Sequence, residues 1–197
     1  MARSRTVTSG GGVDLVADSV ATVNVNASYL MSAAGDIRPG VGEAWLITAL
    51  AGGGQIQFTD GANDTADGGG GGFPQNEDIL GLQIFITRDV YAKTAASTFG
   101  VAAGKIIDIT KVKSAILTNG ATLRPPSGEI WYITFIYTGQ NISTTLRMTD
   151  GTNVVTLNTS MLDAAISPPI KIDNSTYIIN NSGAGNNMFI SAWKAYP

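Results

Sequence analysis

Short segments in which apolar and polar residues alternate are spread along the whole chain. The clearest of them are VATVNVNA, GQIQFTDG, TTLRMTDG, NVVTLN, STYIINNSG and NMFISAWKAY. Alternation with a period of two residues is typical of a strand that buries one face and exposes the other. Two further segments, EAWLITAL and EIWYITFIY, are rich in the aromatic and β-branched residues that strands favour. The pattern therefore predicts an all-β chain.

Turn-forming residues separate these predicted strands at short intervals. Gly, Asn, Asp and Pro supply the backbone conformations that tight turns require, and here they fall between the apolar segments. Many short strands with closely spaced turns indicate a β-sandwich or a barrel. The only helical candidates are brief, around residues 17–20 and 160–165.

One eleven-residue segment occurs twice. RPGVGEAWLIT begins at Arg38, and RPPSGEIWYIT begins at Arg124, 86 positions later. FTDG and MTDG also recur in the same order, as do IFITRDVY and IKIDNSTY, at nearly the same offset. Three ordered matches indicate a tandem duplication, with an N-terminal arm (1–12) followed by two similar units (13–107 and 108–197). A unit of this length suits a small eight-stranded jelly roll or β-sandwich.

The repeated segment has a structural interpretation. Its proline cannot donate to a strand ladder and so marks a strand entry or edge, and its glycine supplies the turn. We expect Trp45 and Trp131 to point into the core of each unit, with Ile47 and Ile133 on the same face two residues later. The glutamate of each copy stands at the strand start, where its carboxylate reaches solvent or backbone N–H groups.

Composition excludes several kinds of function. The chain has no Cys and no His, so disulfides, thiolate catalysis, Cys-based zinc sites and histidine bases are excluded. The net charge is −3, which disfavours a nucleic-acid surface. The sequence contains no apolar segment long enough to span a membrane and no signal peptide. No G-x-S-x-G, H-E-x-x-H or Walker motif occurs, so we expect no enzyme and no cofactor.

An acidic, glycine-rich segment at residues 59–73 is the most unusual stretch. Oxygen ligands for Ca²⁺ are available there from Asp60, Asn63, Asp64 and Asp67. The position twelve from Asp60 is a glycine where an EF-hand has a glutamate, so a solvated insertion loop is the preferred interpretation and no metal site is assigned. Possible contact residues on this loop and on the last strand are Asp60, Asn63, Asp64, Asp67, Phe73, Trp193 and Tyr196.

The N-terminal segment MARSRTVTSGGG has the properties of an assembly arm. Its RTVTS portion alternates as an edge strand does, so it can add to the sheet of a neighbouring molecule. Arg3 and Arg5 can meet an acidic neighbouring surface, and Val7 lies between them and the glycines.

The repeated features resemble the small β-structured virion proteins of tailed bacteriophages. The resemblance rests on the Pro-to-Trp segments (39–45 and 125–131), the Asp-Gly turns (60–61 and 150–151), and the later strands with Tyr91 and Tyr177. It implies jelly-roll units on a particle surface, as in head decoration or cement proteins and tail appendages, which are often trimers. The chain also resembles the double-jelly-roll major capsid proteins of membrane-containing viruses, which are longer.

We therefore expect a non-enzymatic virion structural protein, first of all a head decoration or cement protein that stabilises the capsid. The alternatives are a tail- or fibre-associated receptor- or carbohydrate-binding module and a small jelly-roll capsid protein. The expected partners are other copies of the chain and virion proteins such as the major capsid protein, with no nucleic acid and no membrane. Assembly is expected in the host cytoplasm.

Overall fold

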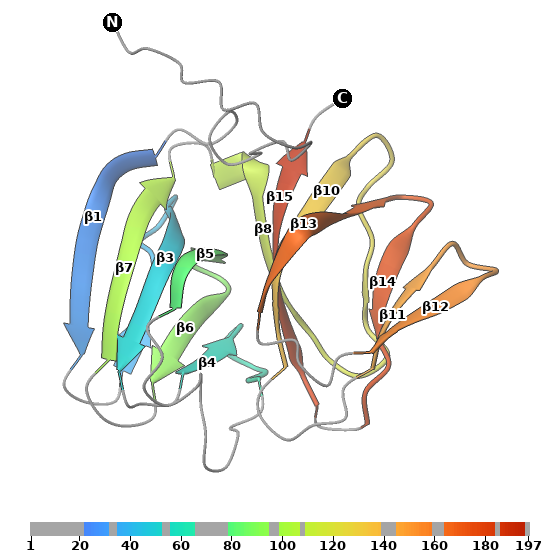
Figure 1. Ribbon diagram of the computed structural model, residues 1–197, viewed down its shortest axis with the longest axis horizontal. Helices are drawn as coiled ribbons and strands as arrows, with labels where there is room; N and C mark the ends of the chain where they lie inside the picture. The colour runs from blue at the N-terminus through green and yellow to red at the C-terminus, as the bar shows by residue number, and fades with distance from the viewer. Residues whose placement is uncertain are drawn as a thin grey trace, which may run out of the picture.

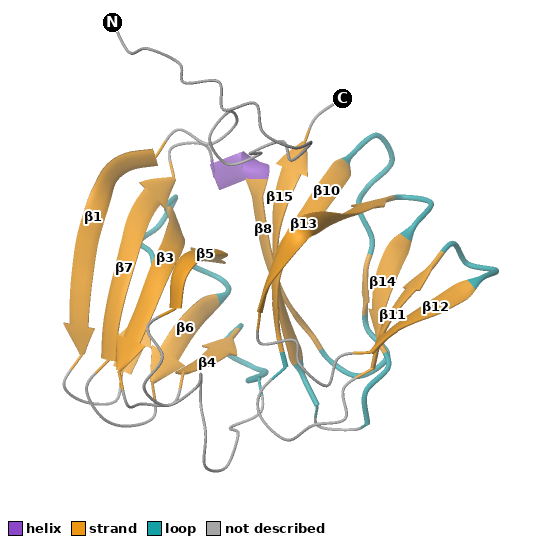
Figure 2. Cartoon of the chain, viewed as in Figure 1, coloured by secondary structure: helices purple, strands orange, loops and turns teal. Residues whose placement is uncertain are grey.

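The structure is a computed structural model, and it describes nine segments of the chain. These are residues 22–31, 35–52, 56–65, 79–94, 99–106, 109–138, 145–158, 164–183 and 186–195. Apart from one short 3-10 helix, η1 (Ile109–Lys111), the regular structure within them is β-strand, which confirms the all-β prediction (Figures 1 and 2). The predicted arm at 1–12 lies outside the described segments, as do Asp67, Phe73 and Tyr196.

The first half of the chain forms two antiparallel sheets. One sheet has the order β1-β7-β3-β5, with the strand bounds Thr22–Met31, Phe99–Ile106, Ala44–Gly52 and Ile79–Thr87. The other has the order β2-β6-β4, with the bounds Gly35–Ile37, Tyr91–Thr94 and Ile56–Thr59. Between the two sheets lies a core of buried apolar side chains that includes Ile47, Phe58 and Ile86.

The second half forms two further antiparallel sheets. One has the order β13-β10-β15-β8, with the bounds Ala164–Asp173, Ile130–Tyr137, Met188–Ala195 and Val112–Leu117. The other has the order β12-β11-β14-β9, with the bounds Val154–Asn158, Thr145–Thr149, Tyr177–Asn180 and Thr122–Leu123. The core between them contains Trp131, Ile133 and Ile190.

Corresponding strands of the two halves occupy the same places. The order β1-β7-β3-β5 of the first half is equivalent to the order β8-β15-β10-β13 of the second. In the same way, β2-β6-β4 is equivalent to β9-β14-β11. The pairing register shifts once after Ile47 and once after Ile133, at the same point of the repeated segment. An isolated bridge between Thr59 and Asp64 stands where Thr149 pairs with Val154 in the second half.

The helical expectation around residues 160–165 is wrong where the structure describes that segment. Ala164 and Ala165 begin β13, where they pair with Ile136 and Phe135 of β10. Strand pairing with a neighbour overrides the local preference of alanine for a helix, because the ladder satisfies the backbone groups.

The two halves share buried surface along a seam. β5 packs against β8, β15 and β10, the strands in the middle of the molecule (Figure 1). Ala44, Leu46 and Phe85 of the first half form one cluster with Val112 and Trp193 of the second. The core of the first half itself includes further side chains from the second half, namely Phe135, Tyr137 and Phe189. The outer face of the second half's central sheet therefore completes the first half's core.

Candidate functional site

The repeated glutamates bind the tryptophan of their own strand. Glu129 Oε2 accepts a hydrogen bond from Trp131 Nε1 at 2.6 Å, and Glu43 Oε2 accepts from Trp45 Nε1 at 3.4 Å. Glu43 Oε2 also accepts from the N–H of Gly40 at 3.2 Å. The two carboxylates thus fix a strand entry in each half, and neither is directed at the other as a catalytic pair requires.

The repeated arginines tie this strand entry to a distant turn. Arg38 Nε donates to the carbonyl of Arg88 at 2.7 Å, and its guanidinium lies 4.2 Å from the centroid of the Tyr91 ring. Arg124 Nε likewise donates to the carbonyl of Asn174 at 2.6 Å, and its guanidinium lies 4.6 Å from the centroid of the Tyr177 ring. Sequence reasoning missed this contact, although arginine and tyrosine recur at one offset.

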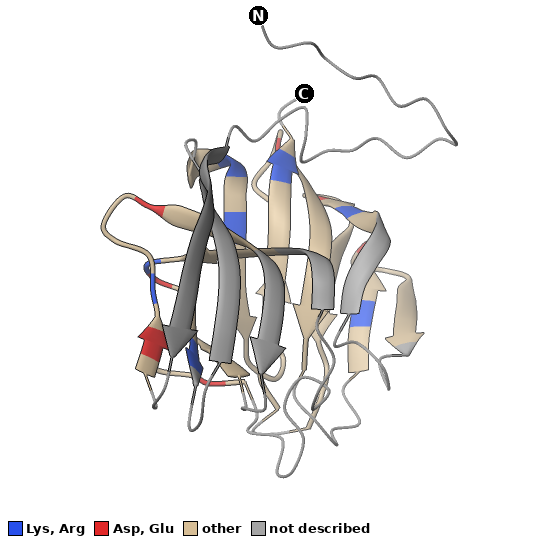
Figure 3. Cartoon of the chain, turned by 60° about the vertical axis from the view of Figure 1, so that its left-hand side comes forward, with Lys and Arg blue, Asp and Glu red and all other residues tan. Residues whose placement is uncertain are grey.

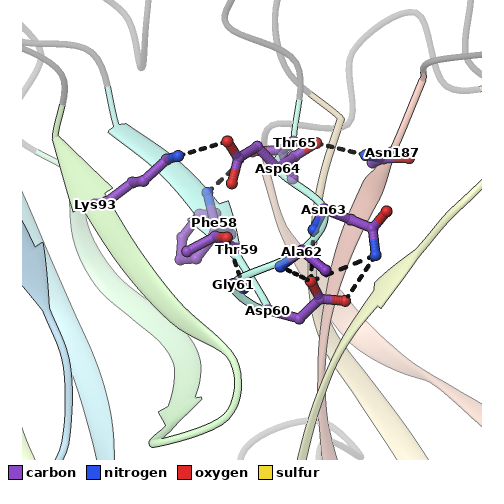
Figure 4. Close-up of polar contacts among 10 residues, drawn as sticks. All are labelled: Phe58, Thr59, Asp60, Gly61, Ala62, Asn63, Asp64, Thr65, Lys93 and Asn187. Atoms are coloured by element: carbon purple, nitrogen blue, oxygen red, sulfur yellow. Dashed lines mark hydrogen bonds and ion pairs between the residues drawn. The ribbon is translucent and has the colours of Figure 1, made fainter.

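The Asp-Gly turn of each half is held by its own aspartate. Asp60 Oδ1 accepts from the N–H groups of Ala62 at 2.9 Å and Asn63 at 2.7 Å, and the Asn63 side chain donates to Oδ2 at 3.1 Å (Figure 4). Gly61 has a φ of 89°, a left-handed conformation that glycine adopts without strain. Partial burial raises the pKa of Asp60, but the hydrogen bonds from Asn63 and Ala62 outweigh it and hold that pKa below its usual value.

Asp64 makes one contact within the first half and one with the second half. Its carboxylate pairs with Lys93 Nζ at 2.5 Å, and its carbonyl accepts from Asn187 Nδ2 of the second half at 2.7 Å (Figure 4). Burial raises the pKa of Asp64, but the hydrogen bonds from Lys93 and Thr59 outweigh this effect and hold that pKa below its usual value. Within the described segments there is no group of three or more acidic, His or Cys side chains that could hold a metal ion. The Ca²⁺ hypothesis also involves Asp67, which lies outside them.

The matching aspartate of the second half, Asp150, is expected to titrate with a pKa of about 2. The side chain of Asn153 is the main cause, and the N–H groups of Asn153 and Thr152 add to it. Because the folded state favours the ionised form, this turn's contribution to stability is complete above the ordinary carboxyl pKa of about 3.9. It is lost as the pH falls toward the folded value.

An NMR titration of the Asp150 carboxyl carbon measures this pKa directly. Asn153→Ala should move it back toward the ordinary value, because that substitution removes the side-chain donor. The same pKa in Asn153→Ala and in the unaltered chain would show that the Asn153 amide does not stabilise the carboxylate.

Trp193 is not at the surface, contrary to the expectation that it is an aromatic contact residue. Its side chain is 1 % exposed and packs in the seam beside Leu46 and Phe85. The expectation failed because both faces of β15 are buried, one in each half. Among the described residues, the exposed large apolar side chains are Val41, Ile109, Val154 and Val155, and none of them is aromatic.

A cleft of about 540 Å³ opens where the two halves meet. Its lining includes Glu43, Arg88, Asp89, Lys113, Ser114 and Lys194. The hydroxyl of Ser114 donates to the carbonyl of Phe85 across the seam. Acidic and basic residues are interspersed along the described strands and loops (Figure 3). The lining of the cleft thus contains both acidic and basic side chains.

In the part of the chain that the structure describes, no helix has the length and apolarity to cross a membrane. Comparisons with protein-family models, curated proteins and solved structures found no match to this chain.

Proposed function

We propose that each half is a jelly roll and that the two arose by duplication. A jelly roll has eight strands in two sheets. The second half has eight, in the orders β13-β10-β15-β8 and β12-β11-β14-β9. The described part of the first half has seven strands in corresponding places, and its bridge between Thr59 and Asp64 supplies the position of the eighth. The paired arginine, glutamate and Asp-Gly contacts support the same proposal.

We further propose that the chain is a non-enzymatic structural protein of a phage particle, in the decoration or cement layer of the head. The seam is the observation that carries this proposal. Phe189 stacks on Phe58 at 3.8 Å between centroids, and Tyr137 donates its hydroxyl to the carbonyl of Ile56 at 2.9 Å. A molecule whose halves share one core transmits load as a single body, which a particle-stabilising protein requires.

The use of the polar side chains supports a mechanical role. Ser191 Oγ accepts from the N–H of Phe85 at 2.7 Å, and Asn180 Nδ2 donates to the carbonyls of Leu117 at 2.7 Å and Asn186 at 2.9 Å. These buried groups fix strands and loops in place, as satisfied polar networks do in rigid cores.

A small jelly-roll capsid protein is the second candidate. The observation that favours it is that one chain contains two units of matching strand order. A shell subunit built from two such units would cover a larger area of the particle surface while using one fold twice. It differs from the first candidate in being part of the shell.

Quantitative mass spectrometry of purified particles tests both candidates. We expect hundreds of copies per particle. Decoration predicts that the copies can be stripped from an intact shell of another protein, whereas a capsid role predicts that no shell remains without them. A few to some tens of copies would favour a tail- or fibre-associated binding module. Absence from every particle would overturn the virion proposal.

A further inference from the structure

The last strand of one sheet, β12, presents an open edge. β12 (Val154–Asn158) stands at the end of the order β12-β11-β14-β9 and pairs with β11 alone among the described strands (Figure 1). Val154 is 54 % exposed and Val155 is 60 % exposed. Because neighbouring residues of a strand point to opposite faces, apolar surface is exposed on both sides of this edge.

The backbone of β12 directs donors and acceptors away from β11. The N–H of Asp150 donates to the carbonyl of Asn153 at the turn, which sets the alternation of the ladder. The backbone N–H and C=O groups of Val155 and Leu157 then point toward β11. Those of Val154, Thr156 and Asn158 point away from it. In the first half, the N–H of Thr65 donates to the carbonyl of Phe58 at the position that matches Val155, in agreement with this alternation.

At the corresponding edge of the first half, the described residues 64 and 65 are engaged in other contacts. Asp64 stands where Val154 stands in the second half, and it carries a charge that pairs with Lys93. Its outward carbonyl accepts a hydrogen bond from the side chain of Asn187. Charge on an edge strand and cover by another segment are two ways in which proteins prevent unwanted strand pairing. Neither is present at β12 among the described residues.

Three of the other edge strands are protected. β5 and β8 pack against each other along the seam. β13 contains Pro168 and Pro169, which lack an N–H, and the exposed Lys171. β12 has neither proline nor charge. The edge strand β1, TVNVNASYLM, also has neither, but among the described residues it is β12 whose apolar side chains are observed to be exposed.

We propose that β12 pairs antiparallel with β12 of a second copy of this chain about a two-fold axis. Such an interface places β12 opposite the identical strand of the second copy. A charged side chain on β12 would therefore lie close to the same charge on that second copy. From Gly151 to Asn158 the sequence GTNVVTLN contains no charged residue, so two copies meet without repulsion. Pairing joins the two four-stranded sheets into one and covers both valines. The surface acts in the same way whether or not the chain belongs to a particle.

The size of the surface sets the strength of the contact. Interfaces below about 1,200 Å² in total are weak and transient, and a pair of five-residue strands lies in that class. The isolated chain should therefore dimerise only at high concentration. Many copies held close together strengthen such a contact through effective concentration.

Analytical ultracentrifugation over a wide concentration range tests the pairing. We expect a reversible monomer–dimer equilibrium that Val155→Lys weakens at least about tenfold, because like charges then meet across the axis. Val41→Lys is the matched control, since Val41 is an exposed valine in a turn and its substitution should leave the equilibrium unchanged. A monomer at every concentration, or equal dimerisation of Val155→Lys and the unaltered chain, would overturn the proposal.

Hydrogen exchange on the unaltered chain gives a measurement that needs no variant. The outward amides of Val154, Thr156 and Asn158 should become protected as the concentration rises. A chain that lacks residues 1–12 should dimerise as the full chain does. Loss of dimerisation on that truncation would overturn β12 pairing and identify the N-terminal segment as the occupant.

Discussion

Phe189→Ala is expected to lower the free energy of unfolding by about 3–5 kcal/mol, the usual cost of removing a buried phenylalanine side chain. Phe189 is 0 % exposed, and its ring stacks on Phe58 with an interplanar angle of 12°. It also lies 6.2 Å from the Phe135 ring. Phe189 belongs to β15 of the second half, yet its neighbours form the core of the first half.

The position of Phe189 also determines how the protein should unfold. Because the core of the first half contains side chains of the second, the loss of either half exposes apolar surface of the other. We expect one cooperative transition in chemical denaturation, followed by circular dichroism and by tryptophan fluorescence, with a lower midpoint in Phe189→Ala. Val41→Ala, at an exposed position, should change stability by less than about 0.5 kcal/mol.

Two separated transitions, with Phe189→Ala displacing only one of them, would contradict the shared core. Phe189→Leu is a useful intermediate variant, since it keeps much of the buried volume but loses the stacking on Phe58. Its loss of stability should fall between those of the alanine variant and the control.

The strands of this protein could be predicted from sequence because alternation is a local property. In Ile130–Tyr137 the pattern places Trp131 and Ile133 on one face, and both side chains lie in the second half's core. The repeated segment also predicts that Trp45 and Ile47 share a face, and both contact the first half's core. Local residue type and a period of two suffice for such expectations.

The seam could not be predicted in the same way. In β15, Met188, Ile190 and Ala192 face the second half's core, while Phe189 and Trp193 face the first half. A strand buried on both faces reads as a nearly continuous apolar segment, and that segment does not reveal which neighbour covers each face. Apolar residues at both parities are present in the sequence, but they do not show that Trp193, predicted as a possible contact residue, is covered by the first half.

The repeated turn motif is longer than the part of it that was recognised in the sequence. FTDG and MTDG were recognised as repeated, but the unit extends further, to Thr-Asp-Gly-x-Asn. The threonine hydroxyls of Thr59 and Thr149 each accept from the glycine N–H at 2.9 Å. Asn63 and Asn153 each donate to the aspartate. The five positions were visible in the sequence, and their joint role follows only from the geometry of the closed turn.

Trp131→Ala is expected to destabilise the protein by about 3–5 kcal/mol, and by more than Trp45→Ala does. Trp131 is 5 % exposed, and its Nε1–H donates to Glu129 at 2.6 Å. The ammonium groups of Lys113 and Lys194 lie 5.9 and 5.7 Å from its ring centroid, which adds a cation–π contribution. Trp45 is only partly buried, and its bond to Glu43 is longer at 3.4 Å.

The two tryptophans form a matched pair, because each follows the same Gly-Glu-x-Trp segment and enters the equivalent strand. Chemical denaturation of the two alanine variants compares them under one condition. Glu129→Leu removes only the acceptor and should cost about 1–3 kcal/mol, since the indole N–H loses its partner in a nearly buried site. Equal losses in the two tryptophan variants would mean that the repeated strand entry, and not the deeper burial of Trp131, determines the contribution of each copy.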